Sequence, residues 1–269
     1  MTPRRRTDVP PRKRFGQHFL EPAWVAKLCG VLDASPDDTF LEIGPGRGAL
    51  TAALAPRVRR LVAVEIDRDL AAALPSRVPG NVHVITGDFL EVDLDELLAR
   101  EGQPLRVVGN LPYNVSSPIL FRLLAAAGDG RRFRDATVML QKEVADRIAA
   151  RPGDRAHGAL AIQTALGADV DRLLTLPPGA FRPPPKVTSA VVRLRFRPPA
   201  AAVDRAAFER LVRALFVHRR KTLLNALRPL ADQLGRSAEE AIAQARLDPV
   251  QRPETLAVAD IVRLTAAVL

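Results

Sequence analysis

The sequence is poor in cysteine, and Cys29 is the only one it contains. A disulfide framework is therefore excluded, and a reducing cytoplasm is the expected location. No apolar run approaches the roughly 20 residues needed to cross a bilayer. The basic start of the chain lacks the apolar segment of a secretory signal. We therefore expect a cytoplasmic protein that makes no membrane contact.

Patterns typical of metal binding and of nucleophilic catalysis are also missing. The four histidines, His18, His83, His157 and His218, show no metal-ligand spacing, and one cysteine cannot complete a site. No serine stands in a nucleophile elbow. The sequence predicts chemistry that uses no metal and no covalent enzyme intermediate.

Acidic residues are outnumbered, with 30 Asp and Glu against 40 Lys and Arg, which gives a net charge of +10. Such an excess favours a polyanionic partner. Arginine is strongly preferred over lysine, as a GC-rich genome would produce, but that bias does not explain the excess itself. The 269 residues, 47% of them hydrophobic, suffice for one full α/β domain with a small appendage.

Three parts follow one another along the chain. Residues 1–14 form a basic, proline-containing arm. In residues 15–200, short apolar strands alternate with helical patterns, which predicts a Rossmann-like α/β domain with a mostly parallel, seven-stranded sheet. Residues 201–269 contain no convincing strand and predict a small all-α domain. The strands are expected at 39–43, 61–66, 82–85, 105–109, 136–140, 170–176 and 187–196, the last two as an antiparallel edge pair. Helices are expected at 21–32, 49–55, 67–74, 93–100, 117–127 and 141–150.

Polar or glycine residues end three successive predicted strands. The first strand runs into a turn that contains Gly44 and Gly46, the second ends at Glu65, and the third ends at Asp88. In an open α/β sheet these ends form the ligand crevice, where glycines admit a ligand and a carboxylate can hold ribose hydroxyls. Turn glycines with capping acids are the structural alternative, and a nicotinamide dehydrogenase is the functional one.

The fourth predicted strand runs into Asn110, Leu111, Pro112 and Tyr113. An aromatic amine is a poor nucleophile because its lone pair is delocalised into the ring. Acceptors on its two N–H groups, such as an Asn oxygen and a backbone carbonyl, can hold it near a sulfonium methyl, and a tyrosine can stack on the base. The segment predicts an amino-group methyltransferase that acts on nucleic acid, with an Asx-type turn as the alternative.

Six stretches together resemble the KsgA (RsmA) family of ribosomal RNA adenine dimethyltransferases. They are RKRFGQHFL at 12–20, LEIGPGRGALT at 41–51, GNLPYNVS at 109–116, LQKEV at 140–144, PGAFRPPPKVTSAVV at 178–192 and HRRKTLLNAL at 218–227. The resemblance implies dimethylation of two adjacent adenines in the 3′-terminal hairpin of small-subunit rRNA, within a pre-30S particle, by a monomer that uses S-adenosylmethionine.

The resemblance also implies roles for individual residues. Phe181 falls in the base-stacking loop, with an ordinary core aromatic as the alternative. His18 and His157 depart from the Asn and Tyr common at these positions, and only a backbone contact of residue 18 would survive the change. The implied cofactor contacts fall on His18, Leu20, Gly44, Glu65, Asp88 and Asn110, and Gly46 belongs to the same turn.

Two basic clusters are expected to bind rRNA phosphates. One lies in the arm, at Arg12, Lys13 and Arg14, and the other is Arg219, Arg220 and Lys221, read as consecutive positions on a helix. A solvated helix face is the alternative for the second cluster. Two other functions stay open, an Erm-type methyltransferase of large-subunit rRNA and a ribosome-assembly factor whose methylation is secondary.

Overall fold

The computed structural model describes residues 12, 17–101, 104–127, 131–198 and 203–269. Most of the predicted basic arm, including Lys13 and Arg14, lies outside these residues. The chain divides into two compact units, residues 1–142 with 172–194 and residues 143–171 with 195–269. No helix in the described part is long and apolar enough to span a membrane.

A single seven-stranded sheet contains all of the expected strands, in the order β4-β3-β2-β5-β6-β9-β7. The pairs β4-β3, β3-β2, β2-β5 and β5-β6 are parallel. The last two strands are neighbours, as predicted, but only β7 is an edge strand. The strands are β2 (Thr39–Ile43), β3 (Arg60–Glu65), β4 (Val82–Thr86), β5 (Leu105–Asn110), β6 (Phe133–Gln141), β7 (Ala168–Leu176) and β9 (Ser189–Phe196).

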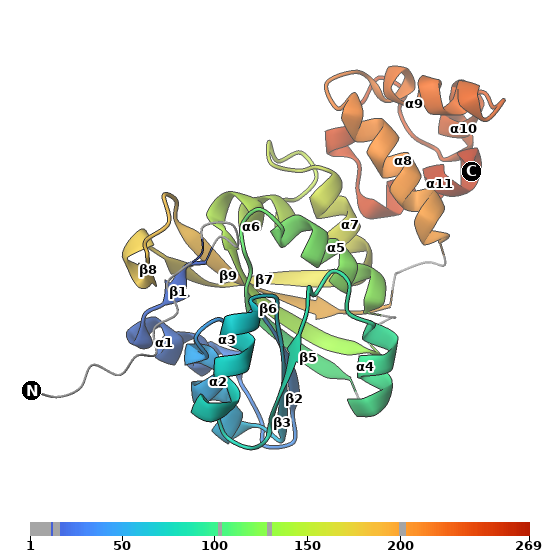
Figure 1. Ribbon diagram of the computed structural model, residues 1–269. Helices are drawn as coiled ribbons and strands as arrows, with labels where there is room; N and C mark the ends of the chain where they lie inside the picture. Colours follow the sequence, from blue (N-terminus) through green and yellow to red (C-terminus); the bar gives the residue numbers. More distant parts are fainter. Residues whose placement is uncertain (1–11, 13–16, 102–103, 128–130, 199–202) are drawn as a thin grey trace, which may run out of the picture. The chain divides into compact units, whose positions relative to one another are not determined.

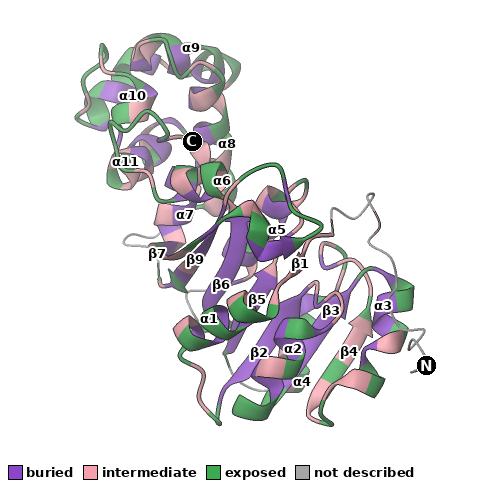
Figure 2. Cartoon of the chain, turned by 90° about the vertical axis from the view of Figure 1, so that its left-hand side faces the viewer, coloured by how far each residue is buried: buried purple, intermediate pink, exposed green. Residues whose placement is uncertain are grey.

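Helices cover both faces of this sheet, with α1, α2 and α3 on one side and α4 and α5 on the other (Figure 1). The central strands are buried while the edge strand β4 is only half-buried (Figure 2), which explains why the central strands are almost continuously apolar. The helices are α1 (Pro22–Leu32), α2 (Ala49–Leu54), α3 (Arg68–Ala73), α4 (Leu94–Glu101) and α5 (Ser116–Ala126).

A second, two-stranded sheet was not predicted. β1 (Phe19–Leu20) pairs antiparallel with β8 (Phe181–Arg182), and Leu20 lies opposite Phe181. The pair joins the segment that precedes α1 to the loop between β7 and β9. Two of the stretches that carried the family resemblance are therefore neighbours in space.

A buried arginine fixes the start of β5. The guanidinium of Arg106 donates to Asp38 over 2.8 Å and pairs with Asp135 at 2.9 Å, and it also donates to the carbonyl of Leu32. Arg106 is 2% exposed, so these acceptors replace the water that the charge has lost. The strand that ends at Asn110 is thereby anchored to α1, β2 and β6.

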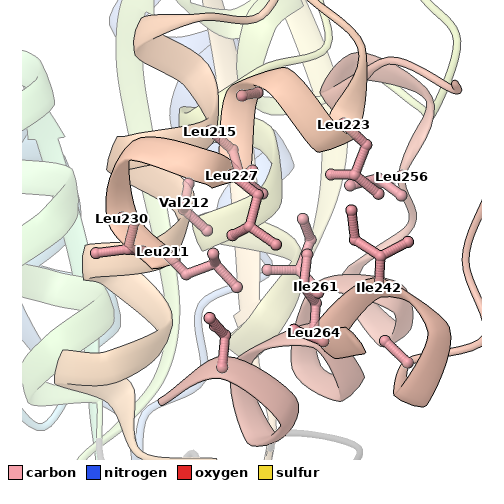
Figure 3. Packing of buried hydrophobic residues seen from close by; sticks show 14 of the residues in the cluster. Leu211, Val212, Leu215, Leu223, Leu227, Leu230, Ile242, Leu256, Ile261 and Leu264 are labelled. Atoms are coloured by element: carbon pink, nitrogen blue, oxygen red, sulfur yellow. The ribbon is translucent and has the colours of Figure 1, made fainter. Parts of the chain in front are cut away.

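The second unit is helical and has its own apolar core (Figure 3). It contains α6 (Lys142–Ile148) from Glu143 onward, α7 (Ala159–Gly167), α8 (Arg205–Val217), α9 (Leu223–Gln233), α10 (Ala238–Gln244) and α11 (Val258–Val268). Ile162 and Leu166 of α7, a helix that was not predicted, belong to this core. The unit therefore includes residues that the sequence pattern assigned to the first domain. His157, where the family often has Tyr, is buried here, with its ring nitrogens 3.2 Å from the carbonyl oxygens of Ala150 and Leu256.

Candidate active site

A cleft lies at the carboxyl ends of β2, β3 and β5 in the first unit. Parallel neighbours end at the same sheet edge, so the predicted strand-end residues meet there. The residues that line it are Gln17, His18, Phe19, Leu20, Leu28, Glu42, Gly44, Pro45, Gly46, Arg47, Ala49, Leu50, Glu65, Ile66, Asn110, Leu111, Pro112, Tyr113 and Met139. Nine of the predicted residues are among them: His18, Leu20, Gly44, Gly46, Glu65, Asn110, Leu111, Pro112 and Tyr113.

The glycine turn after β2 has a left-handed backbone. Gly44 has φ 68° and Gly46 has φ 58°, values that favour glycine over residues with a Cβ. A Cβ on Gly46 would lie 3.0 Å from the ring of Phe19, whereas a Cβ on Gly44 would meet no atom of the described residues within 4 Å. The turn therefore leaves open space beside the backbone of Gly44, where a ligand can approach it.

Glu65 is held in position by the backbone. Its two carboxylate oxygens accept from the N–H of Gly46 over 2.8 Å and from that of Asp67 over 2.9 Å. Burial raises the pKa of Glu65, although these backbone hydrogen bonds oppose the rise. Each oxygen keeps acceptor capacity, which suits the ribose hydroxyl pair predicted to bind there.

Glu42 is a cleft residue that the sequence analysis did not select. It is 2% exposed, and its Oε2 has no hydrogen-bond partner in the described part of the chain. Burial raises its pKa to about 7, assisted by Glu65 and opposed by the hydroxyl of Thr51. An orphaned buried carboxylate calls for a cationic or hydrogen-donating ligand group. It lies within β2, two positions before Gly44, and no sequence pattern shows that it is buried beside the cleft.

The amide of Asn110 has a defined orientation. Its Nδ2 donates to the main-chain oxygen of His18 over 2.6 Å. A carbonyl oxygen can only accept, so the nitrogen must face it and the side-chain oxygen occupies the other branch of the amide. Asn110 can therefore accept a hydrogen bond from a ligand amine, as the sequence analysis predicted.

Leu111 and Pro112 form the turn that follows. The N–H of Leu111 donates to the carbonyl of Met139 over 3.3 Å, and the carbonyl of Pro112 accepts from Val115 over 3.1 Å. The half-buried ring of Tyr113 lines the cleft after this turn. Burial raises the pKa of Tyr113, so its phenol is neutral and its ring is free of charge at physiological pH.

Asp88 and Phe181 do not line the cleft. Asp88 accepts from the N–H of Leu90 over 2.9 Å and so caps the turn after β4, and its cofactor role stays a prediction. Phe181 is 2% exposed and packs in the core with Val25 and Leu28 of α1. This burial favours the core alternative, and the base-stacking role of Phe181 stays a prediction.

The two basic clusters have different settings. Arg12 pairs with Asp67 at 3.0 Å and also with Asp69, so its guanidinium already has carboxylate partners. Arg219, Arg220 and Lys221 are exposed, but they form the turn between α8 and α9 and are not consecutive helical positions as expected. Phosphate binding by either cluster stays a prediction.

The fold and the cleft define a Rossmann-like methyltransferase: a mostly parallel seven-stranded sheet with a glycine turn, the carboxylate of Glu65 and an Asn-Leu-Pro-Tyr turn at adjacent strand ends. Residues 10–267 match the ribosomal RNA adenine dimethylase family. The chain belongs to this family and is a methyltransferase that modifies ribosomal RNA.

Relatives are similar along nearly their whole length. The ribosomal RNA small subunit methyltransferase A of Acinetobacter baylyi is 45% identical over 259 residues, which cover 94% of this chain and 91% of that protein. The same enzyme of Aromatoleum aromaticum is 46% identical over 258 residues, 94% and 92% of the two chains.

Solved structures share the fold. The 23S rRNA methyltransferase ErmE is 27% identical with a TM-score of 0.67, covering 93% of this chain and 99% of that one. A dimethyladenosine transferase from Plasmodium falciparum has a TM-score of 0.76 at 24% identity, covering 92% and 96%.

Proposed function

We propose that this enzyme uses S-adenosylmethionine to dimethylate the N6 amino groups of two adjacent adenines in the 3′-terminal hairpin of small-subunit rRNA. It acts as a monomer on a pre-30S particle and contributes to small-subunit assembly. The orientation of Asn110 carries the chemical part of this proposal, because it presents an acceptor for an amine at the cleft. The relatives named small subunit methyltransferase A support the substrate.

The cleft residues fit the cofactor. Glu65 is placed for ribose hydroxyls, and the orphaned Oε2 of Glu42 suits a positively charged part of the ligand. The open space beside Gly44 admits the ligand close to the backbone. When bound, S-adenosylmethionine supplies an electrophilic methyl group on its sulfonium.

The residues of the chain do the positioning. Asn110 Oδ1 accepts from one N–H of the adenine amine. A backbone carbonyl of the same turn, that of Leu111 or of Pro112, accepts from the other. Tyr113 stacks on the base and excludes water from it. Together these contacts localise the nitrogen lone pair and aim it along one direction, so orientation and electrostatics account for the rate enhancement.

The experiment offers labelled cofactor with unmethylated small and large ribosomal subunits, each in turn, and maps the label. We expect two adjacent dimethyladenosines near the 3′ end of the small-subunit rRNA. Label confined to the large subunit would support the Erm-type alternative, to which the structural likeness to ErmE points, and would overturn the proposal. Tight binding of the small subunit without methyl transfer would favour a pure assembly factor.

A further inference from the structure

Tyr113 is held at both its ring and its hydroxyl group. The hydroxyl lies 2.5 Å from Oγ of Ser189, the first residue of β9, which is fully buried. The ring faces the imidazole of His18, with the ring centroids 5.8 Å apart and an interplanar angle of 26°. A phenylalanine could make the second contact but not the first.

His18 connects three separate segments. Its main-chain oxygen accepts from Asn110, its ring lies against Tyr113, and its Nδ1 lies 2.7 Å from the carbonyl oxygen of Pro183. That carbonyl can only accept, so Nδ1 must hold a proton.

The link to Pro183 extends the small sheet. β1 begins at Phe19, directly after His18, and β8 ends at Arg182, directly before Pro183. The imidazole thus adds a side-chain hydrogen bond next to the backbone pairs of β1 and β8.

We propose that the side chains of His18 and Ser189 are positioning residues that fix the ring of Tyr113 for stacking on the target base. The proposal rests on the function proposed above, in which Tyr113 receives the adenine. Ser189 fixes the far end of the ring and His18 limits its tilt. A misplacement of about 1 Å near reacting atoms can cost as much as roughly 100-fold in rate, so these contacts matter for turnover.

Tyr113 is the only tyrosine in the chain, so its titration can be followed alone by ultraviolet difference absorption. The hydrogen bond from Ser189 lowers the pKa that burial raises. Ser189→Ala is therefore expected to raise the pKa of Tyr113 further, and His18→Ala, which uncovers the ring, to lower it. Tyr113→Phe serves as the spectroscopic blank, and Ser76→Ala and His83→Asn, both at exposed positions outside the cleft, serve as matched controls.

Kinetics test the consequence. His18→Asn keeps a donor but loses the ring, and His18→Phe keeps a ring but loses the donor. We expect Ser189→Ala and Tyr113→Phe each to lower kcat roughly tenfold, and the double variant to be no slower than either, because both remove the same hydrogen bond. Cofactor affinity should stay unchanged in Ser189→Ala, because Ser189 does not line the cleft. His18→Phe should keep more activity than His18→Asn.

Additive losses for Ser189 and Tyr113, or a Tyr113 titration indifferent to both positions, would overturn the proposal. If Ser189→Ala does not fold, Tyr113→Phe removes the same hydrogen bond from the tyrosine side. The kcat of Tyr113→Phe is then compared with that of wild type and of the His18 variants. Failure of the proposed function can be distinguished from failure of this positioning proposal. If the proposed function is wrong, wild-type protein does not methylate small-subunit adenine, but the pKa of Tyr113 still changes in the Ser189 and His18 variants.

Discussion

The side-chain amide of Asn110 donates to the main-chain oxygen of His18 over 2.6 Å, although 92 positions separate the two residues in the chain. Asn110 lies at the cleft because it ends β5, and His18 is held there because it directly precedes β1, which pairs with β8. The amide oxygen that remains is the acceptor on which the proposed chemistry depends. This relationship allows a direct test of the catalytic assignment.

Asn110→Ala is expected to lower the single-turnover rate of methylation by about 100-fold or more, because an acceptor for the amine is lost. RNA affinity should change little. Asn110→Asp should not restore activity, since a carboxylate oxygen would replace the donor that faces the carbonyl of His18. Filter binding of RNA and quenched single-turnover assays measure both quantities, and a wild-type rate in either variant would refute the role.

Glu65→Ala is expected to weaken S-adenosylmethionine binding roughly 10- to 100-fold, because a lost charge-assisted hydrogen bond costs about 1.5–3 kcal/mol. Isothermal calorimetry measures this affinity. Glu91→Ala, which removes an exposed carboxylate outside the cleft, is the matched control. Equal affinities for the two variants would show that Glu65 orders the turn at Gly46 without contacting the ligand.

Glu42 should make stability depend on pH. Its pKa is about 7 in the folded protein, above its ordinary value of 4.5. The contribution of Glu42 to the free energy of unfolding is therefore fully present below pH 4.5 and is lost as pH rises through about 7. Glu42→Gln should therefore gain stability over wild type between pH 5 and pH 8, by about 3 kcal/mol at the upper end. Denaturant unfolding without cofactor measures the difference, and a pH-independent difference would contradict the assignment.

Local pattern was sufficient to predict the main sheet. Buried parallel strands read as short apolar runs with turn residues at their ends, and the functional groups stand at those ends. The sequence therefore placed Gly44, Glu65 and Asn110 at the cleft that they line in the structure, and their roles stay predictions. Glu42 was missed because it lies within a strand, where its burial beside the cleft cannot be read from a sequence pattern.

The small sheet could not be predicted in the same way. β1 and β8 each have two residues, too few for any periodicity, and their pairing joins distant parts of the chain. The burial of Phe181 depends on that pairing, which is why its core position emerged only from the structure. The turn at Arg219 was predicted to be helical because Thr222 was not recognised as a helix cap. Thr222 precedes the first residue of α9, and its hydroxyl oxygen accepts a hydrogen bond from the N–H of Asn225.

Phe181→Ala is expected to cost about 3–5 kcal/mol of unfolding free energy, because it empties a buried aromatic site in the core of the first unit. The folded fraction should keep RNA affinity, since the ring is buried in the core. Thermal unfolding and RNA binding at a temperature below the transition separate the effects. Reduced RNA affinity with unchanged stability would support the base-stacking role.

The salt dependence of RNA affinity tests whether the exposed turn of the second unit binds RNA. Arg219, Arg220 and Lys221 have no carboxylate partner among the described residues and are free to meet phosphates. If they neutralise single-strand phosphates, the slope of log affinity against log salt should change by about 0.7 for each phosphate that is no longer neutralised. Replacing the three by alanine should therefore flatten the slope by about 2 and weaken RNA binding at low salt, with cofactor affinity unchanged.

The control is a triple variant with the same loss of charge at three other exposed positions of this unit, Arg236, Arg246 and Arg252. An equal slope change in both variants would indicate a diffuse field of the whole unit, and an unaltered slope in the first would show that this turn faces solvent in the complex.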